Sequence, residues 1–178
     1  MTQIEDGKGS GNRAEVNAEQ QLVVRAITLS EIEHESEDHG LSYTWTSGNR
    51  DIDAADTLLL LKNTSDTELH IDSVILSSGN AATRYTIHLP TTEVTVTGTT
   101  ITGINLNTAS SNVADASAAA DEENNSQGDI IADISLLTTT SFIVPLLGLI
   151  LGKNKSLGID QVTESTAGNA TIIGHYAD

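Results

Sequence analysis

The chain has 178 residues, a length that suits one ordinary domain with an appended segment. Its 8 basic and 25 acidic residues give a formal net charge of -17 at pH 7, which opposes binding to nucleic acid or to an anionic membrane surface. The chain has no cysteine, so disulfide bonds and thiolate metal sites are excluded.

The surplus of acidic residues indicates a high-salt environment. Lysine occurs at only four positions, Lys8, Lys62, Lys153 and Lys155. In molar salt the Debye length falls to about 3 Å, so an acidic surface repels itself little. At low salt the same charge would destabilise the compact state. The alternative interpretation is an ordinary acidic surface protein.

Residues 1–19 show almost no apolar periodicity and predict an extended arm. The stretch lacks the basic and apolar blocks of a secretory signal, so we expect a protein that stays in the cytoplasm or joins a particle assembled there. Gly7, Lys8, Gly9 and Gly11 do not have the spacing of a phosphate-binding loop. The glycines instead suit an arm that follows a neighbouring surface closely.

An acidic segment, EIEHESEDHG at residues 31–40, follows the arm region and contains two histidines. In an α-helix, His34 would lie near Asp38 but not near His39, because side chains four residues apart share a face and those five apart do not. We therefore expect a solvated acidic linker here and no metal site.

From residue 20 onward, alternation of apolar and polar residues predicts β-strands. Thr-rich and Val-rich segments of this length, separated by turn residues, predict an all-β fold, an antiparallel β-sandwich or jelly roll spanning residues 20–178. The leucines at 58–61 indicate a central strand buried on both faces or an interface strand. The predicted strands are 20–29, 41–46, 57–62, 68–77, 84–89, 93–97, 100–106, 142–151, 156–163 and 170–176.

Two further segments stand out. Residues 108–128 are small, polar and acidic, and predict a long surface loop with a short helix over 113–121. The apolar run 142–151 is too short for the roughly 20 residues that span a bilayer, so we expect a buried strand, with a re-entrant or membrane-active peptide as the alternative. Together with residues 57–61, this run offers more apolar surface than one small core needs, which favours subunit contacts.

The residues expected of an enzyme do not form a known motif. The histidines are His34, His39, His70, His88 and His175, and neither G-x-S-x-G nor H-E-x-x-H occurs. We expect His70 and His88 to be exposed or at an interface. We also expect no enzymatic activity, no cofactor and no bound metal.

Two other short patterns have alternative interpretations. The aspartates Asp51, Asp53 and Asp56 resemble the start of a calcium loop, but the glycine and the distal glutamate of an EF-hand are missing. They predict either a cation bound in a high-salt environment or a plain hydrated turn. Tyr43 and Trp45 share one face of the predicted strand 41–46. They predict either an aromatic surface that binds a receptor glycan or a pair in the core.

The opening DGKGSGNRAEVNAEQQLVVRAITLSEIEHES resembles the start of a family of small structural proteins of tailed viruses. That family's pattern runs D-G-x-G-S-G-N-x-A-x-V-N-x-x-x-x-L-x-V-x-A-x-T. The segments GTTITGINLNTASSN (98–112) and LILGKNKSLGIDQVTESTAGNATI (149–172) resemble its middle and C-terminal strands, with GKNKS replacing the usual proline-lysine-glycine turn. The opening matches at Asp6, Gly7, Gly9, Ser10, Gly11, Asn12, Ala14, Val16, Asn17, Leu22, Val24, Ala26 and Thr28.

This resemblance implies a β-rich accessory protein of the virus particle and, with the acidic bias, a tailed virus of halophilic archaea. We expect a homo-oligomeric capsid decoration or turret protein on the capsid exterior, assembled in the host cytoplasm. The alternative is a host-surface binding module or a tail or baseplate accessory protein, with Tyr43, Trp45 and the loop 108–128 as its receptor surface. In the first hypothesis the arm attaches to the major capsid protein through Asp6, Gly7, Gly9, Ser10, Gly11, Asn12, Ala14, Val16 and Asn17.

Overall fold

The structure is a computed structural model, and it describes residues 15–16, 22–23, 31–51, 56–79, 81–123, 128–162 and 167–177. The chain forms two compact units, residues 1–30 and 31–178. In the first unit, β1 (Glu15–Val16) pairs antiparallel with β2 (Leu22–Val23). Apart from the backbone of these strands, the predicted arm and most of the predicted strand 20–29 lie outside the described residues.

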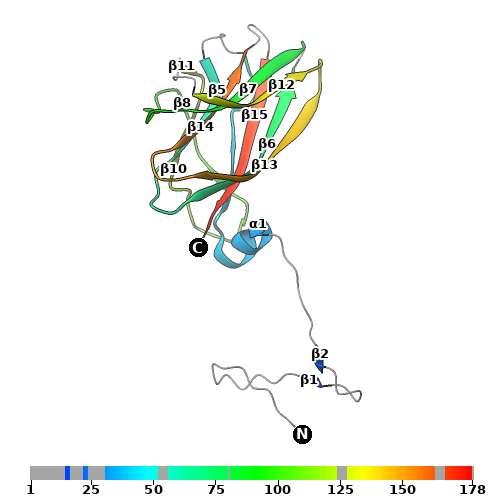
Figure 1. Ribbon diagram of the computed structural model, residues 1–178, viewed down its shortest axis with the longest axis vertical. Helices are drawn as coiled ribbons and strands as arrows, with labels where there is room; N and C mark the ends of the chain where they lie inside the picture. The colour runs from blue at the N-terminus through cyan, green and yellow to red at the C-terminus, as the bar shows by residue number, and fades with distance from the viewer. Residues whose placement is uncertain are drawn as a thin grey trace. The chain divides into compact units, whose positions relative to one another are not determined.

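The second unit begins with α1 (Glu31–His34) and a π-helical turn, η1 (Glu35–His39), and continues almost entirely as strands (Figure 1). The strands are β3 (Ser42–Thr46), β4 (Arg50–Asp51), β5 (Asp56–Asn63), β6 (Leu69–Ser78), β7 (Thr83–Leu89), β8 (Thr99–Ile101), β9 (Ile104–Asn105), β10 (Ala116–Ala120), β11 (Glu122–Glu123), β12 (Asp129–Leu136), β13 (Ser141–Leu151), β14 (Ser156–Gln161) and β15 (Ala167–Tyr176).

These strands form two antiparallel sheets. The seven-stranded sheet has the order β12-β7-β14-β5-β10-β8, with β11 also pairing with β5. The six-stranded sheet has the order β13-β6-β15-β3-β9, with β4 also pairing with β15. None of the helices in the described part of the chain is long and apolar enough to span a membrane.

The eight long strands pair in a nested pattern. β3 pairs with β15, β5 with β14, β6 with β13, and β7 with β12. Pairing of β15 with β6 and of β14 with β7 then joins alternate pairs of this nested order into the two sheets. A ribbon of four nested antiparallel pairs rolled into two sheets is a jelly roll. The predicted all-β sandwich is therefore confirmed.

The core lies between the two sheets. Trp45, Leu59, Leu61, Ile87 and Ile172 are fully buried in one apolar cluster. β6 alternates between buried and half-buried residues, as expected for a strand with one face toward a core. The predicted inward face of 84–89 supplies Tyr85 and Ile87 to this core.

Strand β5 is buried on both faces, as the leucine run predicted. Leu58, Leu59, Leu60 and Leu61 are all 0% exposed, so residues 57–61 offer no surface for subunit contacts. The segment between β7 and β8 covers the end of this strand, because Lys62 donates hydrogen bonds to the carbonyl of Val94 and to Glu93 and Val94 itself is buried. Residues 93–97, predicted as a strand, pair with none of the strands in the described part of the chain.

Residues 90–128 form an insertion between β7 and β12, the innermost pair of the nested ribbon. The predicted helix at 113–121 is wrong, since Ala116–Ala120 form β10 between β5 and β8. Ala118 lies opposite Leu61 and is 2% exposed. The burial of small side chains beside β5 outweighs the weak intrinsic preference of alanine for a helix.

Candidate functional site

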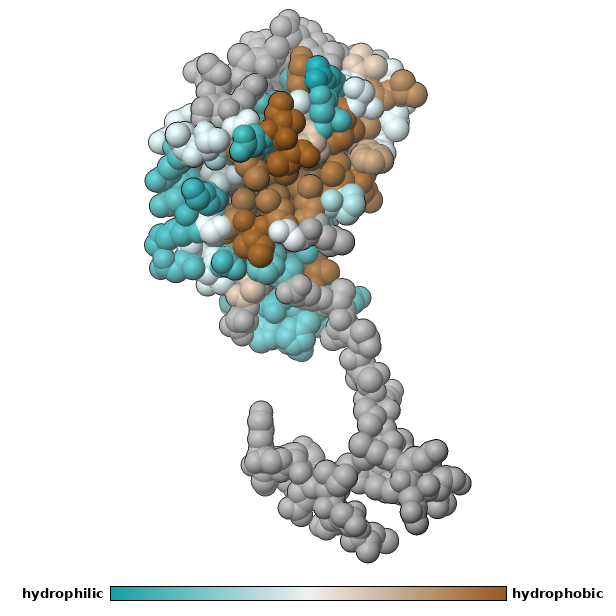
Figure 2. Space-filling view, viewed as in Figure 1, coloured by the Kyte–Doolittle hydropathy of each residue, from teal (hydrophilic) through white to brown (hydrophobic). Residues whose placement is uncertain are grey.

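The edge of the jelly roll formed by β12 and β13 exposes a group of large apolar side chains. β12 is the last strand of one sheet and β13 is the last strand of the other. Figure 2 shows hydrophobic surface gathered where Figure 1 places β13. We call this group the edge strip: Ile130 and Ile131 on β12, Leu137 in the turn, and Phe142, Ile143 and Ile150 on β13, with exposed fractions between 41% and 77%.

The turn at residues 137–140 joins the two halves of the edge strip. It is attached to the end of β6, because the Ser78 amide donates to the carbonyl of Thr140 at 2.9 Å and the Thr139 amide donates to the carbonyl of Gly79 at 2.9 Å. The hydroxyl of Ser78 also bonds the carbonyl of Leu137. The turn is thereby fixed where the two sheets meet, so the edge strip is presented by a rigid scaffold.

The backbone of this edge is poorly suited to pairing with a further strand. Pro145 has no amide hydrogen, and the pairing of β13 with β6 shifts register between Pro145 and Leu149. Gly148 within this break has a φ of 91°. β12 has its own irregularity between Ile130 and Ala132. Such breaks prevent edge-to-edge pairing, so a partner would contact the edge strip through side chains.

The size of the edge strip is that of a protein contact. Taking about 190 Å² for a fully exposed large apolar residue, its six side chains expose roughly 600 Å². The largest apolar patch on a typical monomer is about 300–600 Å², and a standard interface covers about 800 Å² on each partner. The edge strip would thus supply most of the apolar part of such an interface.

A paired charge borders the edge strip on β7 and β12. Arg84 Nε lies 2.8 Å from Asp133 Oδ1, and its terminal nitrogen bonds the second carboxylate oxygen. This hydrogen bond raises the pKa of Arg84 and lowers the pKa of Asp133. Both groups therefore stay charged at neutral pH, and they form a polar rim beside the apolar surface.

The predicted receptor surface at Tyr43 and Trp45 is wrong, because the two side chains are 1% and 0% exposed. They lie on the inward face of β3, with ring centroids 6.0 Å apart. Tyr43 also contacts the ring of Tyr176 at 5.9 Å. Burial raises the pKa of both tyrosines. The core pair, the second interpretation of this pattern, is what the structure contains.

A pocket of about 400 Å³ lies beside this aromatic group, and the wall includes Tyr43, Tyr176, Asn112 and Asp115. The side chains that line it come from β3, β15 and the segments that follow β5 and precede β10. Among the described residues, those that line the pocket include no histidine, lysine or arginine, and Asp115 supplies a carboxylate.

A buried polar cluster lies in the seven-stranded sheet. His88 Nδ1 is 3.3 Å from Asp160 Oδ2, and the hydroxyl of Thr57 donates to Asp160 Oδ1 at 2.8 Å. All three are at most 4% exposed, so the prediction of an exposed or interface His88 is wrong. Burial lowers the pKa of His88, and the charge of Asp160 opposes this shift. The Thr57 hydroxyl bonds the aspartate rather than the histidine.

The structure brings His34 and His39 together, contrary to the prediction from an α-helix. Their ring centroids are 5.0 Å apart, because residues 35–39 form a π-helical turn. Of the aspartates that resemble a calcium loop, Asp51 is exposed on β4, and residues 52–55 lie outside the described part. His70 is half-buried on β6 beside His175.

Comparisons of the chain with protein-family models, curated proteins and solved structures give no match. The sequence pattern had indicated apolar surface at 142–151, but the prediction of a buried strand there is wrong for Phe142, Ile143 and Ile150, because β13 is the end strand of its sheet. The pattern also missed the contribution of β12. The signal was present in the adjacent Ile130 and Ile131, since two neighbouring apolar residues in a strand cannot both point into one core.

Proposed function

We propose that the protein is a non-catalytic structural component of a virus particle, a capsid decoration or turret subunit that assembles as a homo-oligomer. The observation that carries this proposal is the edge strip, an apolar surface of interface size on a rigid edge of the jelly roll. At roughly 600 Å², the edge strip lies at the upper end of the apolar patches that monomeric proteins expose, and patches of this size are often functional.

The occupant of the edge strip that fits best is a second copy of this chain. Two copies that each carry a charge of -17 repel one another, so they can meet only where their surfaces are uncharged. None of the six side chains of the edge strip is charged. Contacts between identical subunits are also more apolar than contacts between transient partners.

Two further arguments support a place in a virus particle. The opening of the chain resembles that of structural proteins of tailed viruses, with matches such as Gly9, Gly11 and Asn17. Jelly rolls also build many viral capsid proteins, although the same architecture serves lectins and cupins. The resemblance therefore selects among the functions that this fold supports.

The alternative is a module that binds a host surface through Tyr43 and Trp45. Both side chains are buried and cannot contact a receptor. The segment 108–128 is in part a strand of the sheet rather than a free loop. No described feature favours this alternative over a structural role.

The test is removal of residues 1–19, which belong to a separate compact unit from the jelly roll. We expect the truncated protein to keep its β-rich circular dichroism spectrum and its oligomeric state, and to lose binding to purified capsids that lack it. A truncated protein that binds these capsids as well as the full chain does would overturn the attachment role of the arm. A full chain absent from particles would overturn the proposal as a whole.

A further inference from the structure

The turn that leads into the jelly roll has an unusual backbone. α1 continues into η1, and the amide of Gly40 bonds the carbonyl of Glu35, five residues earlier. The amide of Leu41 bonds the same carbonyl at 2.8 Å, and Gly40 ends the turn at a φ of 63°. Single π-helical turns are rare and occur frequently at functional sites.

This backbone aligns two histidines that an α-helix would separate. Five residues along an α-helix correspond to a rotation of about 140° beyond a full turn, which would place His34 and His39 on different faces. The wider turn instead brings their rings to a centroid distance of 5.0 Å. One nitrogen from each ring and one oxygen of Glu35 lie within 4.8 Å of one another.

Glu35 carries a buried carboxylate oxygen that lacks a hydrogen-bond partner. The residue is 8% exposed, and its Oε2 atom is buried without a hydrogen-bond partner. Its other oxygen lies 3.5 Å from His34 Nδ1. A buried carboxylate oxygen without a partner is costly, and native proteins rarely leave one unsatisfied. A cation between the carboxylate and the two imidazoles would offset the charge of this buried carboxylate.

The surroundings hold these side chains in place. His34 Nε2 lies 3.4 Å from Asp38 Oδ2, so Asp38 can accept a hydrogen bond from the ring nitrogen that faces away from Glu35. Carboxylates commonly orient metal-binding histidines in this way. Side-chain hydrogen bonds attach the turn to residues 105–112, since the side-chain amide of Asn112 donates to the carbonyl of His39 at 2.9 Å. The side-chain amide of Asn107 likewise donates to the carbonyl of Ser36 at 2.8 Å.

We propose that His34, Glu35 and His39 form a divalent transition-metal site, for which Zn²⁺ is the best-fitting ion. Two imidazole nitrogens and one carboxylate oxygen are typical zinc ligands, and tetrahedral zinc places its ligand atoms roughly 3.4 Å apart. The 3.5 Å separation of His34 Nδ1 from Glu35 Oε1 matches this spacing. Because the His34 side chain is 50% exposed, the fourth position opens toward solvent and suits a water molecule.

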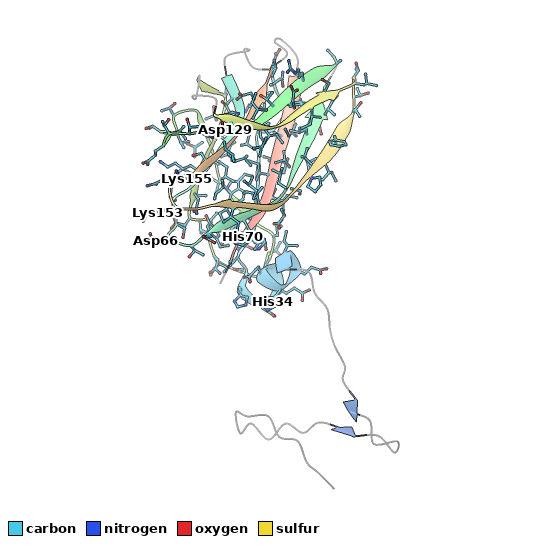
Figure 3. All side chains as sticks on the ribbon, in the orientation of Figure 1. His34, Asp66, His70, Asp129, Lys153 and Lys155 are labelled. Atoms are coloured by element: carbon cyan, nitrogen blue, oxygen red, sulfur yellow. The ribbon has the colours of Figure 1, made fainter. Side chains whose placement is uncertain are left out.

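The ligand types also predict which ions bind this site weakly. Mg²⁺ and Ca²⁺ prefer sites built from oxygen atoms, so they should bind weakly here. Figure 3 shows His34 on the helical turn and His70 on β6. His70 and His175 form a second histidine pair, with a ring distance of 5.1 Å, but no metal-ligand cluster was found at that pair among the described residues. His70 is therefore a matched control.

The test is a calorimetric titration of the full chain with Zn²⁺, in a buffer that contains an excess of Mg²⁺ to occupy diffuse acidic sites. We expect one Zn²⁺ per chain, a rise in the thermal unfolding midpoint, and reversal by a chelator. His39→Ala should abolish this binding, Asp38→Asn should weaken it by about 10- to 100-fold, and His70→Ala should leave it unchanged.

Several outcomes would overturn the metal site. One is Zn²⁺ binding by His39→Ala with the affinity of the original chain, and another is loss of binding in His70→Ala alone. Displacement of Zn²⁺ by equimolar Mg²⁺ would show non-specific attraction to acidic groups. Circular dichroism of each variant separates loss of the site from loss of the fold. The optical spectrum of the Co²⁺-substituted protein reports directly whether imidazole nitrogens bind the ion.

Discussion

The substitution Ile143→Ser tests the assembly role of the edge strip most directly. Ile143 lies on β13 and is 60% exposed. If the full side chain exposes about 180 Å², roughly 110 Å² of apolar surface is available for a partner to cover. At about 25 cal/mol per Å², its loss costs each subunit about 3 kcal/mol of association free energy, or roughly a 100-fold weaker contact.

The same sheet provides a matched control in Ile104. This isoleucine is also 60% exposed, but it lies on β9, at the opposite edge of the six-stranded sheet from β13. Ile104→Ser should leave the oligomer intact. Neither substitution should change the free energy of unfolding of the subunit by more than about 0.5 kcal/mol, because both side chains are largely exposed.

Sedimentation equilibrium in about 2 M salt, where repulsion between acidic subunits is screened, measures the association constant of both variants. The reasoning is refuted if the original chain is monomeric at all concentrations, or if Ile104→Ser and Ile143→Ser weaken the oligomer equally. A shift caused by Ile143→Ser together with a lower unfolding midpoint would identify a folding defect instead of an interface.

Three further predictions concern stability. Gly158→Ala should lower the free energy of unfolding by about 1–3 kcal/mol in chemical denaturation, because its Cβ would lie 2.4 Å from the buried ring of His88. Gly152→Ala is the control and should be neutral, because no atom lies within 4 Å of its Cβ position. Equal effects of the two substitutions would contradict this packing argument. Burial lowers the pKa of His88, so the unfolded chain binds a proton at this residue more readily than the folded chain does. The free energy of unfolding should therefore fall as the pH drops from about 7 toward 5.5, by at most about 1.4 kcal/mol per pH unit. If a His88→Gln variant shows the same pH slope, His88 is not the cause. The thermal unfolding midpoint should rise steeply between about 0.1 M and 1 M KCl and then level off, because the Debye length falls from about 10 Å to 3 Å over this range. Sucrose, which does not screen charge, should not reproduce this rise. A midpoint independent of salt would argue against the high-salt interpretation.

Most of the strands could be predicted from the sequence because their signal is local. Alternating apolar residues predicted β3, β6, β7 and β15, and the leucine run predicted β5 as a strand buried on both faces. Period-two patterns report that side chains share a face of a strand, which depends only on backbone geometry. The all-β fold follows from the number and spacing of these segments.

The same signal failed wherever the partner of a segment decided the outcome. Residues 93–97 alternate as well as β7 does but have no pairing strand, whereas the alanines of β10 gain a strand conformation from their place between β5 and β8. β12 was missed because Ile130 and Ile131 interrupt its alternation at an irregularity in the pairing with β7.

The composition and local pattern of the sequence by themselves determined the charge, most of the strands and the all-β class. Only the tertiary structure decided which face of each strand is buried. It placed Tyr43 and Trp45 in the core and left Phe142 and Ile143 on the surface, because β3 lies inside its sheet and β13 at the edge. It also decided that His34 and His39 meet, since a π-helical turn fastened by distant asparagines replaces the α-helix that the local sequence predicts. Neither outcome is local, because each depends on contacts between residues far apart in the chain.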